Sequence, residues 1–302
     1  MHPTLYHFTD TVGIHSYGLL ILLALLSAFT VSSNRAAKIG VDPDDLPGMY
    51  LLVAMMGILG ARLFYFVFSE PKMFFANPMV FFDGGEGGLV FYGGAIGGTL
   101  SGVAFCWWKK IPVMKMADIG GPAIMLGLAV GRLGCFFAGC CHGAEVVQAT
   151  VSSVLIEFQG GSVVWLNQAP YLSLIFKPGV GVGSIHNLPT YPTQLWEFTG
   201  AMTLFGALSF MWHHLRKFDG QILATTMIFY AGLRSSIENF RGDSIRGENV
   251  VETLSTSQFI SVVMLALSAV LMIVGYTRGL APETEFIPSD DDLDDGSDED
   301  LD

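Results

Sequence analysis

Residues 222–237 read ILATTMIFYAGLRSSI, an apolar stretch typical of a membrane-spanning helix, with one charged residue, Arg234, near its far end. Two further arginines, Arg62 and Arg132, also follow apolar runs. A guanidinium keeps its proton and is costly in hydrocarbon, so arginines at membrane depth usually face a wet cavity and hold an anion. Three of them in one small chain predict a site for a phosphate-bearing ligand, with a phospholipid head group as the nearest source.

The composition places the chain among integral membrane proteins. Hydrophobic residues make up 51% of it and charged residues 14%, with a mean hydropathy of +0.52, unlike an ordinary soluble domain. The first apolar stretch is expected to be retained, because neither a basic start nor a small-residue cleavage site marks a signal peptide. We predict an all-α integral membrane protein with about seven transmembrane helices, at Ile14–Val31, Gly48–Phe68, Leu89–Trp108, Ala117–Phe137, Gln194–Trp212, Ile222–Ile237 and Phe259–Tyr276.

The distribution of Lys and Arg predicts the orientation. If the N-terminus is periplasmic, the cytoplasmic loops hold eight basic residues and the periplasmic loops hold four. Cytoplasmic loops usually carry the excess, so we predict a periplasmic N-terminus and a cytoplasmic C-terminus. Residues from about 144 to 190 are rich in Gly and β-branched side chains. We expect them to form a small periplasmic cap over the site, with room for β-structure.

The chain is expected to divide into a transmembrane domain, residues 1–280, and an acidic tail, residues 281–302. Residues 283–302 carry eleven acidic side chains and no basic one, so nearly all of the net charge of −12 lies there. Such a segment cannot build a core and is expected to be a disordered cytoplasmic tail. Nothing in the chain predicts nucleic-acid binding.

Glycines in the third predicted helix indicate close helix packing. Gly94, Gly98 and Gly102 are spaced four apart, with Gly93 and Gly97 beside two of them. Small residues at this spacing let helix backbones approach closely in lipid. The glycine-rich loop before this helix is a poor candidate for a phosphate-binding loop, because no strand precedes it and no Lys-Ser/Thr pair follows.

A cluster of three cysteines and one histidine follows Arg132. Cys135, Cys140, Cys141 and His142 lie within eight residues, but their spacing matches no standard zinc pattern. Adjacent cysteines are also expected to be poor joint ligands. We therefore predict no metal site and favour packing of small polarizable side chains, with a metal site or an external disulfide as alternatives.

The glycines of the same segment, residues 131–143, predict a helix that breaks at membrane depth. Broken backbone is tolerated there only where it is buried or lines a cavity, and we expect Arg132 to point into that cavity. The next predicted helix begins after Pro192, with Thr193 as a candidate N-cap and Glu197 one turn later. Glu238 follows Arg234 by four residues, so it can pair with that arginine or act as a catalytic carboxylate.

These pieces together resemble the prolipoprotein diacylglyceryl transferase family. The matching segments occur in the family's order and cover most of the chain from residue 14 to about 243, leaving out the acidic tail. They are Ile14–Leu19, Gly60–Leu63, Phe91–Gly97, Gly131–Gly143, Tyr191–Glu197 and Tyr230–Arg241.

The resemblance implies a reaction and its partners. The family transfers the diacylglyceryl group of phosphatidylglycerol to the lipobox cysteine of a preprolipoprotein in the bacterial inner membrane, forming a thioether and releasing glycerol phosphate. No cofactor is implied. Fixed guanidinium groups in a dry site would stabilise the leaving phosphate, and a positive field would favour the attacking thiolate.

The same resemblance assigns roles to residues. The family's essential arginines correspond to Arg132 and Arg234 and its first-helix tyrosine to Tyr17, so these three and Tyr92 are the expected catalytic residues. The expected substrate-binding residues are Arg62, Gly93, Gly94, Gly134, Gly143, Gln194, Glu197, Glu238 and Arg241.

The chain departs from the family's pattern at three positions. Tyr92 stands where many members have a histidine proposed as the catalytic base, and tyrosine is a poorer base at neutral pH. Cys135 and Ala138 stand where members usually have asparagines. His142 is a candidate substitute base. These departures support two alternatives, a phospholipid-binding relative that is inactive or uses another acceptor, and a membrane redox or metal protein built on the cysteines.

Overall fold

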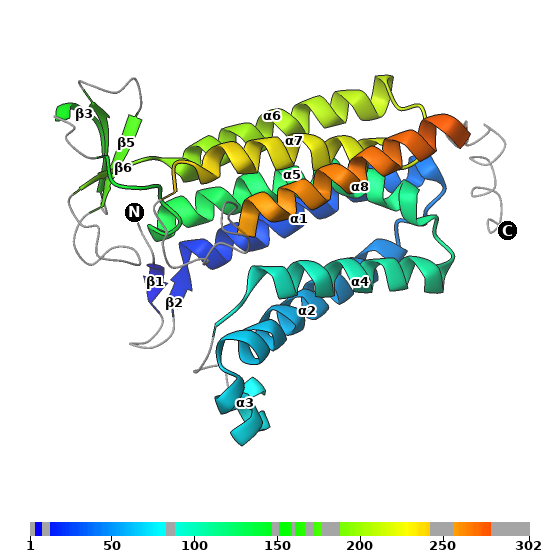
Figure 1. Ribbon diagram of the computed structural model, residues 1–302, viewed down its shortest axis with the longest axis horizontal. Coiled ribbons are helices and arrows are strands. Elements are labelled where there is room, and N and C mark those ends of the chain that lie inside the picture. Colours follow the sequence, from blue (N-terminus) through cyan, green and yellow to red (C-terminus); the bar gives the residue numbers. More distant parts are fainter. Residues whose placement is uncertain are drawn as a thin grey trace, which may run out of the picture. The chain divides into compact units, whose positions relative to one another are not determined.

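The computed structural model describes residues 4–7, 13–82, 88–146, 151–158, 161–166, 172–176, 188–241 and 256–278. Helices contain most of them (Figure 1). The chain falls into two compact units. One comprises Met1–Val31 and Ala117–Pro282, and the described part of the other lies in Ser32–Met116. Each unit is described by itself below.

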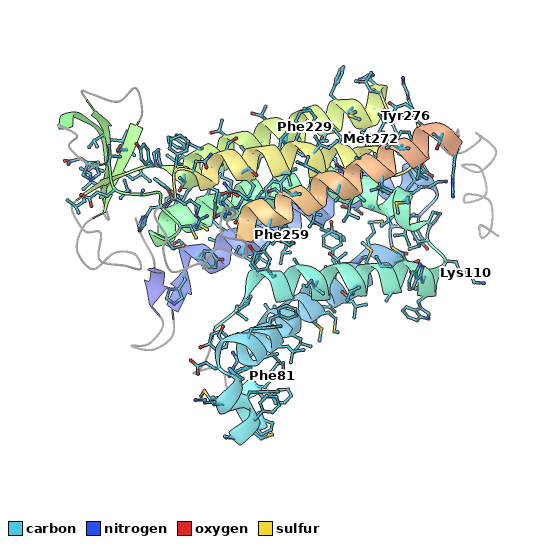
Figure 2. The ribbon with its side chains drawn as sticks, in the orientation of Figure 1. Phe81, Lys110, Phe229, Phe259, Met272 and Tyr276 are labelled. Atoms are coloured by element: carbon cyan, nitrogen blue, oxygen red, sulfur yellow. The ribbon has the colours of Figure 1, made fainter. Side chains whose placement is uncertain are left out.

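Helices α2 and α4 form the core of the second unit. Helix α2 spans Asp45–Phe64 and continues into a π-helical turn, Tyr65–Ser69, and helix α4 spans Phe91–Lys109. Short helices lie between them, namely α3 at Pro71–Ala76 and a 3₁₀ turn at Pro78–Phe82. The sequence analysis did not predict these two. Exposed aromatic and basic residues, including Lys110, mark the surface of this unit (Figure 2).

The predicted close packing of glycines is confirmed between α2 and α4. A Cβ atom added to Gly93 would collide with the carbonyl oxygen of Gly60, and one added to Gly97 would lie 2.5 Å from the carbonyl oxygen of Met56. An added Cβ at Gly102 would meet Val53 at an ordinary 3.4 Å. The tightest contacts with α2 are therefore made by Gly93 and Gly97 rather than by the predicted stripe of Gly94, Gly98 and Gly102.

The larger unit is a helical bundle that includes most of α1, Ser16–Ala36, up to Val31. Its other helices are α5 at Val113–Ala138, α6 at Thr193–His214, α7 at Gln221–Glu238 and α8 at Thr256–Arg278. Helix α7 packs against both α6 and α8 (Figure 1). Large apolar side chains such as Phe229, Phe259 and Tyr276 are exposed on the outside (Figure 2), as expected for helices that face lipid.

A buried carboxylate of α5 caps the start of α7. The two carboxylate oxygens of Asp118, which is fully buried, accept hydrogen bonds from the backbone N–H groups of Gly220 and Leu223 at 2.8 and 2.9 Å. Arg216 lies 3.7 Å from the same carboxylate. Helix N-termini carry unpaired N–H donors and favour negative charge, so Asp118 fixes the two helices relative to each other.

A four-stranded antiparallel sheet lies in the predicted cap segment. Its strands, in spatial order, are β3 at Val151–Phe158, β4 at Gly161–Leu166, β5 at Leu172–Phe176 and β6 at Pro189–Thr190. The expected β-structure is therefore present, and β6 leads directly into α6. A second, unpredicted pair of strands, β1 at Thr4–His7 and β2 at Gly13–His15, precedes α1.

Every predicted transmembrane stretch coincides with a helix, but the chain is mostly helical rather than all-α. Its strands are short segments outside the long helices, where helical periodicity gives no signal. Among the described helices, four are long and apolar enough to cross a membrane by length and composition, namely Ser16–Ile39, Asp45–Ser69, Val113–Ala138 and Ser257–Arg278. The predicted acidic tail, residues 281–302, lies outside the described residues.

Candidate active site

Helix α5 ends in a turn that carries the chain back over its own last residues. The N–H of Gly139 donates to the carbonyl of Phe136 and the N–H of Cys140 to that of Cys135, at 3.2 and 3.1 Å. Gly139 has a positive φ of 70°, so the two bonds form a Schellman motif. This helix end lies in the segment where a break was predicted, and its depth in the membrane stays a prediction. The motif also brings Cys140 next to Cys135, because the residue after the glycine packs against the last turn of the helix in a Schellman motif.

Arg132 forms a buried ion pair with Glu197 of α6. Its Nη2 atom lies 2.8 Å from Oε1 of Glu197, and the side chains are 15% and 1% exposed. Glu197 was predicted as a site residue, but its pairing with Arg132 was not predicted. Within the described part of the chain, the buried Nε atom of Arg132 has no hydrogen-bond partner. One guanidinium donor is thus available to a ligand.

Arg234 has the same arrangement on α7. Its Nη2 atom lies 2.7 Å from a carboxylate oxygen of Glu238 and 3.1 Å from the hydroxyl of Ser257 in α8. The predicted pairing of Arg234 with Glu238 is confirmed. The buried Nη1 atom of Arg234 has no hydrogen-bond partner among the described residues. Sequence reasoning missed Ser257, because a contact across a separate helix leaves no local pattern.

Tyr230 lies near both arginines. It precedes Arg234 by one helical turn, so both residues lie on one face of α7, and Tyr230 also interacts electrostatically with Arg132. Helical spacing alone places Tyr230 on the same face as Arg234. The proximity of Tyr230 to Arg132 is seen only once α5 and α7 are packed together. The two guanidinium groups therefore belong to one region of the larger unit.

The segment after the Schellman turn is tied to the start of α6. Gln194 donates its side-chain amide to the carbonyl of Cys140 at 2.8 Å, and Thr193 donates its hydroxyl to that of Cys141 at 3.0 Å. The prediction that Thr193 is the N-cap of α6 is therefore wrong. That position belongs to Pro192, which makes no side-chain cap. The Oε1 atom of Gln194 is buried and lacks a hydrogen-bond partner among the described residues, so it can accept from a ligand hydroxyl.

Gly143 occupies the tightest position of this segment. Its N–H donates to the carbonyl of Tyr191 at 2.9 Å. An added Cβ would lie 2.6 Å from the Cβ of Tyr191 and 2.7 Å from the carbonyl oxygen of Phe240. The next residue, Ala144, donates its N–H to Phe240. Gly143 therefore allows the chain to pass between the start of α6 and the end of α7, a packing role for this predicted binding residue.

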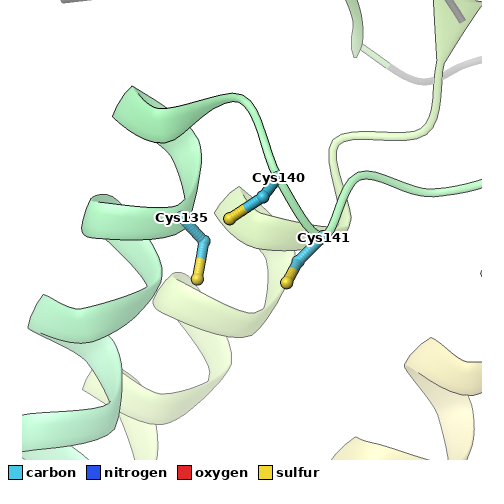
Figure 3. Close-up of side chains that lie close together, drawn as sticks. All are labelled: Cys135, Cys140 and Cys141. Carbon is cyan, nitrogen blue, oxygen red and sulfur yellow. The ribbon is translucent and has the colours of Figure 1, made fainter. Parts of the chain in front are cut away.

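Three thiols converge beside Arg132. The Sγ atoms of Cys135, Cys140 and Cys141 all lie within 4.8 Å of one another (Figure 3), and none of the three is disulfide-bonded in the described structure. Cys141 has a positive φ of 60°, which is uncommon for a residue with a side chain. Hydrogen bonds to Cys135 and Cys141, together with burial, raise the pKa of Cys140. Cys140 and Cys141, predicted from their adjacency to be poor joint ligands, nonetheless place their sulfur atoms close together on this backbone.

Tyr17 and Gly134 lie at the same end of the larger unit. Tyr17 is 44% exposed and interacts electrostatically with Arg132 and the three thiols. A Cβ added to Gly134 would lie 3.3 Å from the Tyr17 ring, so this glycine lets α1 approach α5. His142 is buried, with its Nδ1 atom 3.1 Å from the carbonyl oxygen of Gly143. Arg241 follows α7, and its N–H donates to the carbonyl of Glu238 at 3.1 Å.

The remaining predicted site residues belong to the second unit. Arg62 donates to the carbonyls of Val80, at 3.1 Å, and Phe81, and its guanidinium lies 5.2 Å from the ring centroid of Phe66. These contacts tie the 3₁₀ turn to α2, so the described contacts of Arg62 are structural. Tyr92 lies in the first turn of α4, where its ring meets that of Phe91, and Gly93 and Gly94 follow it.

An apolar groove of about 490 Å³ lies between α6 and α7, apart from the ion pairs. It is lined by Trp196, Thr199, Gly200, Thr203, Leu204, Phe229 and Leu233. None of these residues is charged, so the groove suits a hydrocarbon chain rather than a phosphate.

Taken together, the described structure is a helical membrane protein with two carboxylate-paired arginines at one end of a bundle. The sequence profile of the prolipoprotein diacylglyceryl transferase family matches residues 3–274, and the chain belongs to this family of transferases. A phosphatidylglycerol–prolipoprotein diacylglyceryl transferase 2 of Clostridium perfringens is 34% identical over 270 residues, which cover 88% of this chain and 93% of the relative.

Two further relatives carry the name phosphatidylglycerol–prolipoprotein diacylglyceryl transferase. The protein of Clostridium tetani is 31% identical over 86% of this chain and 92% of its own length. The protein of Paraburkholderia xenovorans is 30% identical over 92% of this chain and 95% of its own length. The similarity therefore spans both units and is not confined to the segment around the arginines.

Proposed function

We propose that the protein transfers the diacylglyceryl group of phosphatidylglycerol to the lipobox cysteine of prolipoproteins. The observation that carries this proposal is the pair of largely buried arginines, whose side chains are 15% and 16% exposed. Each is held by a carboxylate, Arg132 by Glu197 and Arg234 by Glu238, and each keeps one buried nitrogen without a hydrogen-bond partner among the described residues. Two such donors suit a phosphodiester, whose oxygens accept charge-assisted hydrogen bonds. The names of the relatives agree with this substrate pair.

The chemistry follows from where charge develops. The acceptor sulfur attacks C3 of the lipid's diacylated glycerol, the new S–C bond forms, and the C–O bond to phosphate breaks. Glycerol phosphate leaves with the bonding electrons, so negative charge grows on the oxygen that Arg132 and Arg234 face. Guanidinium groups fixed in advance stabilise this charge without reorganising. Glu197 and Glu238 hold them in place, and Gln194 can accept a hydrogen bond from a head-group hydroxyl.

The proposal includes a membrane topology. All seven long helices cross the bacterial inner membrane, with the N-terminus in the periplasm and the C-terminal acidic tail in the cytoplasm. The sheet of β3 to β6 then lies on the periplasmic side, where it continues into the loop that carries Gly143 and the thiols. The excess of basic residues in the loops assigned to the cytoplasm supports this orientation.

The test is a reconstituted reaction in detergent with phosphatidylglycerol and a peptide that contains a lipobox cysteine. Mass spectrometry follows the diacylglyceryl thioether. We expect the Arg234→Ala variant to lower kcat/KM by about 100-fold or more, because it removes a fixed donor to the leaving group. The matched control is Arg278→Ala, at the exposed end of α8, which should react like the unmodified protein.

Two results would contradict the proposal. Normal turnover by Arg234→Ala would remove this arginine from the reaction. An unmodified protein that binds phosphatidylglycerol but forms no thioether would instead be a phospholipid-binding member of the family that is inactive or uses another acceptor. That alternative is based on two departures from the family's pattern. This chain has Tyr92 where many members have a histidine, and Cys135 where members usually have an asparagine.

A further inference from the structure

The three thiols beside Arg132 have the geometry of an incomplete tetrahedral metal site. Zinc binds thiolate sulfur at about 2.3 Å, which separates neighbouring sulfur ligands by about 3.8 Å in a tetrahedron. The Sγ atoms of Cys135, Cys140 and Cys141 already lie within 4.8 Å of one another (Figure 3). The present separations are therefore close to those of a tetrahedral site.

The backbone around the thiols is held in place before any ion binds. The Schellman turn sets Cys140 against Cys135, and the carbonyls of Cys140 and Cys141 accept hydrogen bonds from Gln194 and Thr193. Cys141 is held at a φ of 60°. Residues with a side chain adopt this left-handed conformation at an energetic cost, and such residues are often found at functional sites. Outer contacts of this kind orient the ligands of metal sites.

The surroundings also balance the charge. Zn²⁺ with three thiolates carries a net charge of −1, and the guanidinium of Arg132 interacts electrostatically with Cys135 and Cys141. Cys135 is buried, whereas Cys140 and Cys141 are half-buried. No fourth Cys, His, Asp or Glu joins the group among the described residues. The set thus provides three ligands and one open position, the arrangement of catalytic rather than structural zinc sites.

We propose that Cys135, Cys140 and Cys141 bind Zn²⁺ and that the open position receives the acceptor thiol of the prolipoprotein. The second part rests on the proposed function. It explains how a chain with Tyr92 in place of the family's histidine can activate a thiol, because a thiol coordinated to zinc is bound as the thiolate. The three cysteines belong to the same unit as Arg132, which faces the leaving phosphate.

The transfer step then balances as follows. The acceptor thiol gives up its proton to solvent as it binds the metal. Its sulfur forms the S–C bond to the diacylglyceryl carbon, and the C–O bond breaks with its electron pair passing to phosphate. The thioether product is a weaker ligand than a thiolate, so it leaves the metal, and glycerol phosphate carries away the negative charge. No oxidation or reduction takes place.

Metal binding is tested without any activity measurement. Protein purified under reducing conditions is analysed for bound metal, then stripped with a chelator and titrated with Zn²⁺ and with Co²⁺, which reports thiolate ligation by sulfur-to-cobalt charge-transfer absorption. We expect about one metal per chain and strong charge-transfer bands. The triple variant Cys135→Ser, Cys140→Ser, Cys141→Ser should lose both, whereas Cys106→Ser, a buried cysteine of α4 outside the cluster, should retain both.

Three results would overturn the metal site. They are no metal on the reduced protein, equal binding by the triple-serine variant, and a disulfide among these cysteines in protein prepared from cells with thiols blocked at lysis. Because stripping and refilling need no mutation, a folding defect of the triple variant cannot imitate the expected result. The single variant Cys140→Ser, expected to weaken Zn²⁺ binding at least tenfold, provides a milder comparison.

The open position is tested by adding the acceptor peptide to the Co²⁺ form. The cysteine peptide should shift the charge-transfer spectrum, and the matched serine peptide should leave it unchanged. No shift with either peptide would refute the second part of the proposal. A shift without thioether formation would leave the metal site standing and refute the proposed transfer. Full thioether formation by metal-free protein would leave the transfer standing and refute the role of zinc.

Discussion

The ion pair of Arg132 and Glu197 serves both the stability of the fold and the binding of a ligand. The carboxylate is only 1% exposed and the guanidinium 15%, so both charges have lost most of their hydration. Each is tolerable because the other is 2.8 Å away, and a lone charge in this position would be costly. The buried Nε atom, which has no hydrogen-bond partner among the described residues, is then available to a ligand without the cost of burying a further charge. Stability and ligand binding therefore depend on the same ion pair.

Removing one partner of this pair should be far more costly than removing one partner of an exposed pair. We expect Glu197→Ala to lower the free energy of unfolding by about 3–5 kcal/mol, because Arg132 would keep an uncompensated buried charge. The control is Asp45→Ala, which breaks the partly exposed pair of Asp45 with Lys109 at 2.6 Å and should cost about 1 kcal/mol or less. Denaturant unfolding in detergent, followed by circular dichroism, measures both.

A double variant separates stability from function at this site. Replacing both partners, as in Arg132→Met with Glu197→Leu, should recover most of the stability, because an apolar pair of similar volume suits a buried position. Transferase activity should stay lost, since the phosphate donor is gone. Equal destabilisation by Glu197→Ala and Asp45→Ala would show that the Arg132–Glu197 pair is hydrated in the folded protein.

Helix α4 shows how single glycines set the distance between elements. Gly97 faces the backbone of α2, where an added Cβ would lie 2.5 Å from the carbonyl oxygen of Met56, whereas Gly102, further along α4, meets only a Val53 methyl at 3.4 Å. A backbone carbonyl cannot rotate away as a flexible side-chain end can. Close approach of two helices gains dispersion contacts that replace the weak hydrophobic driving force in lipid. Gly97 and Gly102 therefore have different structural roles despite similar sequence surroundings.

Alanine at these two positions should separate the roles. We expect Gly97→Ala to force α2 and α4 apart and to cost about 1–3 kcal/mol, as overpacking in well-packed regions does. Gly102→Ala should be neutral or slightly stabilising, because alanine is the better helix former. Thermal unfolding in detergent compares the two variants. If Gly97→Ala is as stable as Gly102→Ala, the close contact of α2 with α4 is not maintained in the protein.

The extent to which sequence predicted the fold depends on the range of the physical signal. Apolar runs located every long helix, because burial in hydrocarbon constrains a whole stretch at once. The pairing of Arg234 with Glu238 followed from helical spacing alone. Contacts between separate elements left no such trace, so Glu197 as the partner of Arg132 and Ser257 beside Arg234 emerged only from packing. The convergence of Cys140 and Cys141 depended on one backbone angle, which composition does not encode.

At the scale of the whole molecule, the basic residues of the loops predict the orientation in the membrane. The sequence predicts that the segment between the third and fourth apolar stretches, with Lys109, Lys110 and Lys115, lies in the cytoplasm, because basic residues are retained on that side. The strand β3 belongs to the cap segment, which is predicted to be periplasmic. Lys110 and Ile156 are both exposed in the structure, so each offers an accessible position for a label on one of these two faces.

Cysteine labelling of intact spheroplasts tests this topology. A bulky membrane-impermeant maleimide should modify Ile156→Cys in intact spheroplasts, whereas Lys110→Cys should react only after the membrane is permeabilised. The unmodified chain, with its own four cysteines, is the background control, and the gel shift added by each new cysteine is the readout. Labelling of Lys110→Cys in intact spheroplasts, with Ile156→Cys protected, would invert the orientation and place the cap in the cytoplasm. That outcome would also separate the thiols and paired arginines from the periplasmic face, where the acceptor cysteine of an exported prolipoprotein must arrive, and would thus contradict the proposed transfer as well as the topology.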